Sequence, residues 1–133
     1  MATVMREVVL NLPADEVWDC VRAVDKAHEL FAGVLVDGEI EGDLRTVTFA
    51  GGMVAKERIV GVDEAQMRVA YSVVEGPFSL HAASMQVVAD GPLRSRVTWF
   101  SDFKPDALTE MVTPLMEAGL AAMKRNLEDA RAD

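Results

Sequence analysis

The stretch DALTEMVTPLMEAGLAAMKRNLED, residues 106–129, decides the fold because it predicts one long amphipathic helix at the end of the chain. Its apolar residues recur at spacings of three and four, which is the period of a single helix face. A helix of this length, rising about 1.5 Å per residue, crosses a whole domain. Pro114 lies inside the pattern and predicts a kink or a break there. The apolar face consists of Leu108, Met111, Val112, Leu115, Met116, Gly119, Leu120, Met123 and Leu127.

Upstream of this helix the sequence pattern predicts strands joined by turns. Short turns rich in Gly, Asp and Pro separate β-branched and alternating segments, a spacing that predicts an antiparallel meander. A further strand, Thr3–Leu12, opens the chain. The six later strands are expected at Val34–Ile40, Leu44–Ala50, Met53–Val62, Met67–Val74, Leu80–Ala89 and Ser95–Phe103.

Two short helices are expected between the first and second strands. Pro13 suits the first position of a helix, and Val17, Cys20, Val21 and Val24 follow at the spacing of one helix face. Cys20 is therefore interpreted as a small core residue and not as a reactive thiol. The segment from residue 28 to residue 33 predicts the second short helix, which ends on a glycine.

Together these elements predict an α+β fold made of one domain over residues 1–133. A seven-stranded, curved antiparallel sheet would surround the long C-terminal helix, and the two short helices would lie between strands one and two.

Composition and charge exclude several classes of function. Half of the residues are hydrophobic, which is a globular composition, and the net charge of −9 argues against nucleic-acid binding. No stretch approaches the roughly 20 apolar residues of a membrane span, so no membrane insertion is expected. With Cys20 the only cysteine and two histidines in the chain, no disulfide, metal site or cofactor is expected. These features favour a soluble, cytoplasmic protein.

Side-chain alternation along the predicted strands places a few polar residues on the inner face of the sheet. These are Arg45, Glu57, Tyr71 and His81, with Trp99 beside them. Each has a structural interpretation, such as an ion pair or a hydrogen-bonded core residue. An apolar interior with a few convergent polar groups is nevertheless typical of a ligand cavity.

The candidate ligand-binding residues follow from this alternation of side chains and from the apolar face of the long helix. His81 and Glu57 are the candidate catalytic residues. The full candidate set is Arg45, Phe49, Glu57, Tyr71, His81, Met85, Trp99, Met111, Leu115, Met116, Gly119, Leu120 and Met123.

The order of several local motifs resembles the START-like helix-grip (SRPBCC) superfamily and, within it, the polyketide cyclase/dehydrase-like proteins. The motifs are LPADEVW at 12–18, GDLR at 42–45, ERIV at 57–60, VTW at 97–99 and GLAAMK at 119–124. The resemblance covers nearly the whole chain. It implies a sheet that grips the C-terminal helix around a deep cavity, and it implies no single reaction, because relatives bind lipids, hormones or polyketides and some are cyclases or dehydratases.

Three functions remain open from the sequence. The first is a protein, monomeric or homodimeric, that binds a small, mostly hydrophobic, lipid- or polyketide-like molecule. The second is a cyclase- or dehydratase-like enzyme that acts on a hydrophobic carbonyl compound, with His81 or Glu57 as base and Arg45 or Tyr71 as hydrogen-bond donor. The third is an interaction or regulatory module that uses the fold without a ligand.

Overall fold

The computed structural model describes residues 1–132 and confirms the predicted order of elements. Short connections join the strands, and two short α-helices and a 3-10 turn lie between the first strand and the second. The elements are β1 (Ala2–Leu10), α1 (Ala14–Val21), η1 (Val24–Lys26), α2 (Ala27–Leu30), β2 (Leu35–Glu41), β3 (Leu44–Phe49), β4 (Val54–Asp63), β5 (Arg68–Glu75), β6 (Leu80–Ala89), β7 (Ser95–Lys104), η2 (Asp106–Leu108) and α3 (Thr109–Ala132).

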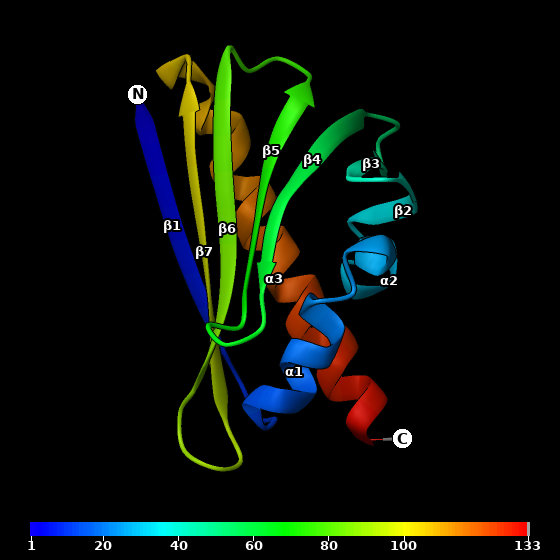
Figure 1. Cartoon of the computed structure of the whole chain (residues 1–133), viewed down its shortest axis with the longest axis vertical. Helices are drawn as coiled ribbons and strands as arrows, with labels where there is room; N and C mark the ends of the chain where they lie inside the picture. The colour runs from blue at the N-terminus through cyan, green and yellow to red at the C-terminus, as the bar shows by residue number, and fades with distance from the viewer. Residues whose placement is uncertain (133) are drawn as a thin grey trace.

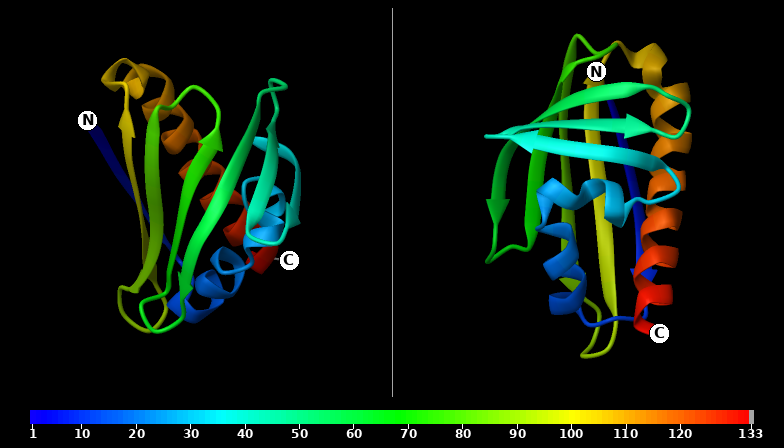
Figure 2. Two further views of the ribbon diagram at one scale, coloured as in Figure 1. Left: turned by 45° about the horizontal axis from the view of Figure 1, so that its top comes forward. Right: turned by 90° about the vertical axis from the view of Figure 1, so that its right-hand side faces the viewer.

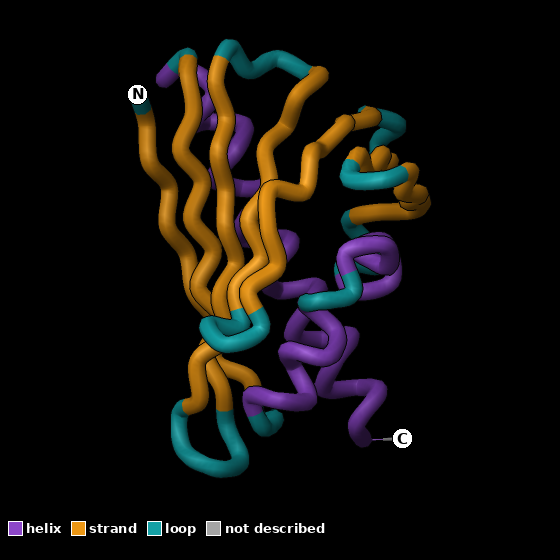
Figure 3. The backbone as a smooth tube through the Cα atoms, viewed as in Figure 1, coloured by secondary structure: helices purple, strands orange, loops and turns teal. Residues whose placement is uncertain are grey.

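The strands form one antiparallel sheet of seven strands in the order β1-β7-β6-β5-β4-β3-β2. The six later strands are a meander, and β1 joins the sheet beside β7, with Ala2 opposite Phe103 and Leu10 opposite Ser95. The first and the last strand of the chain are therefore neighbours in the sheet, as Figure 1 and the tube in Figure 3 show.

The sheet is curved, and β4 is the strand at which its direction changes. The register of β4 against β5 shifts twice, between Lys56 and Glu57 and between Ile59 and Gly61. Such bulges bend a strand and increase its twist. As a result β2, β3 and β4 turn across the end of the molecule toward α3 (Figure 2).

Helix α3 lies along the concave side of the sheet, where the sequence predicts it (Figures 1 and 2). It is one helix from Thr109 to Ala132, so Pro114 does not split it. Polar contacts fix its C-terminal part to the end of β1 and to the residue that follows: Lys124 Nζ donates to the carbonyl of Val9 at 2.7 Å, and the Glu128 carboxylate accepts from the backbone N–H of Asn11 at 2.9 Å.

The largest apolar core fills the end of the molecule near α1, where the sheet, α1, α2 and the C-terminal half of α3 meet. A smaller cluster of Val4, Phe103, Val112 and Met116 holds the opposite end of α3 against β1 and β7. The larger cluster comprises Leu10, Leu12, Val17, Trp18, Val21, Leu30, Val69, Met85, Val87, Val97, Leu120 and Met123.

The prediction for Cys20 is wrong: its side chain is exposed. The buried face of α1 consists of Val17, Trp18 and Val21, so it includes Trp18 and leaves Cys20 on the exposed side. Partial burial and the neighbouring Asp19 raise the pKa of the thiol, so it is not an activated nucleophile.

None of the helices within residues 1–132 combines the length and the apolar character that a membrane crossing requires.

Candidate functional site

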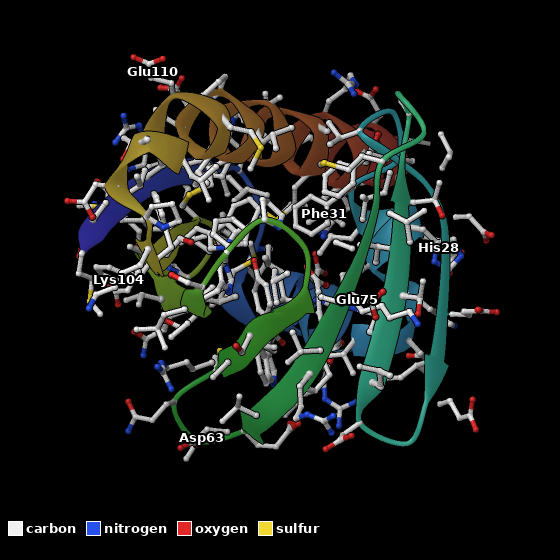
Figure 4. The ribbon with its side chains drawn as sticks, turned by 90° about the horizontal axis from the view of Figure 1, so that it is seen from above. His28, Phe31, Asp63, Glu75, Lys104 and Glu110 are labelled. Atoms are coloured by element: carbon white, nitrogen blue, oxygen red, sulfur yellow. The ribbon has the colours of Figure 1, made fainter. Side chains whose placement is uncertain are left out.

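A cavity of about 170 Å³ lies between the concave face of the sheet and α3. Strands β3 to β7 supply one side, and α2 and the N-terminal half of α3 supply the other. Figure 4 looks toward this region from above, with Phe31 between the helix and the strands. Most of the wall is apolar, and its polar groups come from Arg45, Glu57, Tyr71, His81 and Ser101.

Exposed lining residues mark where the cavity approaches the surface. Met53 and Val54, at the β3–β4 turn, are 42% and 53% exposed, and Gly76 and Pro77 lie in the exposed loop between β5 and β6. The mouth is therefore bordered by two turns of the sheet and is itself partly apolar.

Arg45 and Glu57 form a buried ion pair inside the cavity wall. They lie directly opposite each other on β3 and β4, and Arg45 Nε and Nη2 approach Glu57 Oε1 at 2.8 and 2.7 Å. Arg45 Nη1 also donates to the carbonyl of Val24 at 3.0 Å. Burial raises the pKa of Glu57, while the neighbouring guanidinium lowers it. Both contacts use Oε1, and within the described part of the chain Oε2 has no hydrogen-bond partner.

Tyr71 and Trp99 form the second polar pair. The indole Nε1 of Trp99 donates to the hydroxyl oxygen of Tyr71 at 3.1 Å. The guanidinium of Arg45 lies 5.4 Å from the centre of the Tyr71 ring, and Trp99 stacks on Phe31 at 5.6 Å. Burial and the Glu57 charge raise the pKa of Tyr71, which keeps the phenol protonated.

His81 is held by the backbone of the neighbouring strand. Its Nδ1 accepts a hydrogen bond from the backbone N–H of Val73 at 2.9 Å, and its Nε2 lies 3.3 Å from Ser101 Oγ. Burial lowers the pKa of His81 to about 4, against the opposing effect of Asp102, so the ring is neutral at neutral pH. Because Nδ1 accepts a hydrogen bond from a backbone N–H, it carries no proton, and the single ring proton of the neutral histidine is on Nε2. The Phe78 ring covers His81 with centroids 4.8 Å apart.

The structure brings almost all of the sequence-predicted residues to this cavity. Leu120 and Met123 are the exceptions: they belong to the large core near α1 and do not line the cavity. They lie on the same apolar face of α3 as the lining residues, but farther along the helix, where α1 and the sheet close on it. The predicted residues that line the cavity are Arg45, Phe49, Glu57, Tyr71, His81, Met85, Trp99, Met111, Leu115, Met116 and Gly119.

The cavity wall also contains residues that were not among the candidates, and three of them, Phe31, Phe78 and Ser101, contact the predicted polar residues. Ser101 carried a signal, since alternation along β7 places it on the inner face. Phe31 follows a short helix, and Phe78 lies in a loop. In such segments no sequence period predicts the direction of a side chain.

Residues 1–128 match the protein family described as polyketide cyclase/dehydrase and lipid transport. No curated protein matches the sequence.

Several solved structures share the fold. XoxI from Bacillus cereus aligns with a TM-score of 0.88 and 17% identity, over 98% of this chain and 99% of XoxI. Norcoclaurine synthase from Thalictrum flavum, in complex with dopamine and hydroxybenzaldehyde, aligns with a TM-score of 0.75 and 22% identity, over 98% of this chain and 86% of the synthase. The aromatase/cyclase BexL of the BE-7585A biosynthetic pathway has two domains. It aligns with a TM-score of 0.82 and 18% identity, over 96% of this chain and 47% of BexL. At these identities the likeness establishes the fold alone.

Proposed function

Since the chain belongs to the polyketide cyclase/dehydrase and lipid transport family, we propose that it binds a small, mostly apolar molecule in the cavity between the sheet and α3. The observation that carries the proposal is the cavity itself, which lies beside a well-packed core and has polar groups at a few positions only. A filled interior would have favoured an interaction module without a ligand.

Physical chemistry supports this reading of the cavity. Apolar surface removed from water stabilises a complex by about 25 cal/mol per Å², and native interiors leave few voids larger than a water molecule. An unfilled apolar space of this size costs the fold stability, because the side chains around it lose packing contacts. A ligand that restores those contacts binds without any charged partner.

The test is a thermal-shift titration with ethylbenzene, a one-ring hydrocarbon, on the native protein and on two tryptophan variants. Leu115→Trp places an indole in the cavity wall, whereas Val88→Trp places the same group on β6 at a side chain that is 48% exposed and outside the cavity. We expect ethylbenzene to raise the Tm of the native protein and of Val88→Trp, but not of Leu115→Trp. Saturation at 100 times the Kd would add about 2.7 kcal/mol of stability.

Equal shifts in both tryptophan variants would place the binding outside the cavity and contradict the proposal. So would the absence of any shift with ethylbenzene, with longer hydrocarbons and with fatty acids.

A second candidate function, a cyclase- or dehydratase-like enzyme for a hydrophobic carbonyl compound, is supported by Glu57. Its Oε2 has no partner within the described chain, and Glu57 lines a cavity whose wall also includes the hydroxyl-bearing residues Tyr71 and Ser101. A carboxylate in this position could take a proton from the carbon next to a carbonyl group. The C–H electron pair would then form an enolate, whose oxygen the donors would stabilise, and the same proton or one from solvent would return.

Solvent exchange tests this candidate without knowledge of the natural reaction. Acetophenone, a one-ring ketone, is incubated in D₂O with the protein, and the methyl proton signal is followed by NMR. We expect the native protein to accelerate the loss of this signal, Glu57→Gln to abolish the acceleration, and Glu57→Asp to retain part of it. An equal rate in the native and Glu57→Gln proteins would remove the enzyme candidate and leave the binder unaffected.

A further inference from the structure

Two hydroxyl groups in the cavity wall have a proton that no group in the described part of the chain accepts. A tyrosine or serine hydroxyl has one proton to donate and two lone pairs to accept with. Indole N–H can only donate, so the hydrogen bond between Trp99 and Tyr71 uses a lone pair of the Tyr71 oxygen. Within the described chain the Tyr71 proton has no acceptor.

The same argument applies to Ser101. The backbone N–H of Val73 can only donate, which leaves the proton of the neutral His81 ring on Nε2. That proton points at Ser101 Oγ, 3.3 Å away, so Ser101 accepts. Ser101 is 3% exposed, and in the part of the chain that the structure describes its own proton has no protein acceptor. The low pKa of His81, about 4, agrees with a neutral ring.

The two hydroxyls belong to one cluster. Tyr71 and Ser101 occupy the same row of the sheet, on either side of Ala83. The Tyr71 and His81 rings lie 5.8 Å apart, and the His81 ring reaches Ser101 directly. Both residues line the cavity.

The cavity offers a ligand no net charge. Arg45 and Glu57 in its wall pair with each other, and His81 and Tyr71 are uncharged at neutral pH. A carboxylate or an ammonium group would enter without a counter-ion and would lose its hydration. The wall therefore favours an uncharged ligand that carries a hydrogen-bond acceptor.

Size limits the ligand further. The cavity holds about 170 Å³. An apolar protein cavity of about 150 Å³ is known to accommodate benzene, so this volume corresponds to about one ring with a small substituent. The rings of Phe31, Trp99 and Phe78 line it, which suits a flat ligand.

We infer that the ligand is an uncharged ketone or aldehyde of about one ring, and that its carbonyl oxygen accepts hydrogen bonds from the hydroxyl groups of Tyr71 and Ser101. The inference rests on the proposed function and names the ligand class of the same cavity. It assigns Ser101 as a binding residue and His81 as the group that orients the Ser101 proton.

Two ligands that differ by one oxygen test the inference. Acetophenone carries the acceptor, and ethylbenzene has nearly the same shape without it. We expect isothermal titration of the native protein to give a lower Kd for acetophenone than for ethylbenzene. Tyr71→Phe and Ser101→Ala should each weaken acetophenone binding about three- to tenfold, the effect of one lost hydrogen bond. Neither variant should change the Kd of ethylbenzene by more than about twofold, which also shows that the cavity has folded.

Ser84→Ala is the matched control, because Ser84 is a buried serine on the opposite face of β6 and does not line the cavity. It should leave both affinities unchanged. Benzoate, which is charged, and 2-acetylnaphthalene, which has two rings, should bind at least tenfold more weakly than acetophenone.

The outcomes separate this inference from the proposed function. Equal binding of acetophenone and ethylbenzene, unchanged by Tyr71→Phe and Ser101→Ala, would overturn the carbonyl assignment while the cavity remained a binding site. Tight binding of 2-acetylnaphthalene would overturn the limit of one ring. If neither one-ring compound bound, nor any hydrocarbon or fatty acid, the proposed function would itself have failed.

Discussion

At the scale of the residue, the backbone N–H of Val73 determines what the ring of His81 can do. It occupies Nδ1, so the neutral ring can donate from Nε2 but has no free lone pair with which to take a proton. Of the two candidate bases, only Glu57 keeps an unbonded oxygen. The geometry therefore favours Glu57 for proton transfer and gives His81 a positioning role.

The protonation state of His81 is open to direct measurement. Because its pKa lies near 4, we expect ¹⁵N NMR to find the ring neutral, with the proton on Nε2, at every pH from 8 down to about 5. Observation of the proton on Nδ1, or titration near the ordinary value of 6.5, would contradict both the hydrogen-bond assignment and the role given to Ser101.

Stability should also depend on pH through His81. Between pH 6.5 and about 4 the unfolded chain binds a proton at this histidine and the folded protein does not, so the free energy of unfolding falls as the pH falls through this window. Glu57, whose pKa is raised, acts in the opposite direction, because the folded protein holds its proton to higher pH. Urea unfolding of the native protein and of His81→Gln separates the two effects. The native protein should lose more stability than the variant between pH 6.5 and 4.5, and parallel curves would contradict the prediction.

The ion pair of Arg45 and Glu57 predicts an asymmetric response to mutation. Removal of one partner from a buried pair costs about 3 to 5 kcal/mol, because the other charge is left uncompensated. Glu57 can take up a proton when Arg45 is lost, whereas an arginine stays charged. We expect Glu57→Leu to destabilise the protein more than Arg45→Met. The double variant should be more stable than Glu57→Leu alone, and additive losses in urea unfolding would show that the two residues do not interact.

At the scale of the element, α3 packs closely against the sheet at Gly119. A Cβ atom at this position would lie 2.9 Å from Cζ3 of the Trp99 ring and 3.7 Å from Phe31. The absence of a side chain is what allows the helix to rest on the indole that holds the Tyr71 hydroxyl.

Gly119→Ala therefore tests this contact. Alanine favours an α-helix over glycine by about 1 kcal/mol, but overpacking in a core costs about 1 to 3 kcal/mol, so we expect a net loss of stability and weaker binding in the cavity. Ala121→Gly, on the exposed side of the same helix, is the control and should cost about 1 kcal/mol with no effect on binding. A gain in Tm for Gly119→Ala would show that Trp99 moves aside freely.

At the scale of the whole molecule, stability should be uneven between the two ends. Strands β6 and β7 pack against the large core near α1, whereas β2 and β3 rest on a small cluster of Ala27, Leu35 and Val47 beside the cavity. We expect native-state hydrogen exchange to open β2 and β3 at a lower free energy than β6 and β7, whose slowest amides should approach the global value. Ethylbenzene should slow exchange most in β3 and β5, which line the cavity. Uniform protection of the sheet, unchanged by the hydrocarbon, would contradict this picture.

The sequence by itself determined the elements, their order and the faces that they bury. These properties depend on local periods: two residues along a strand, which set the inward direction of Tyr71 and His81, and 3.6 along α3, which sets its apolar face. The short turns determined that strands consecutive along the chain pair with each other in the sheet. The same reasoning failed for Cys20, because the buried face of this short helix includes Trp18 and leaves Cys20 exposed.

Only the tertiary structure decided where the core ends and the cavity begins. Met116 and Met123 share one helix face and have the same chemistry, yet Met116 lines the cavity and Met123 does not, because α1 and the large core cover α3 only toward its C-terminal end. The partners of the polar groups were decided in the same way. The bonds from Val73 to His81, from Trp99 to Tyr71 and from His81 to Ser101 join residues 8, 28 and 20 positions apart. No local period carries this information, since such contacts depend on how strands distant in sequence are aligned and how the sheet bends.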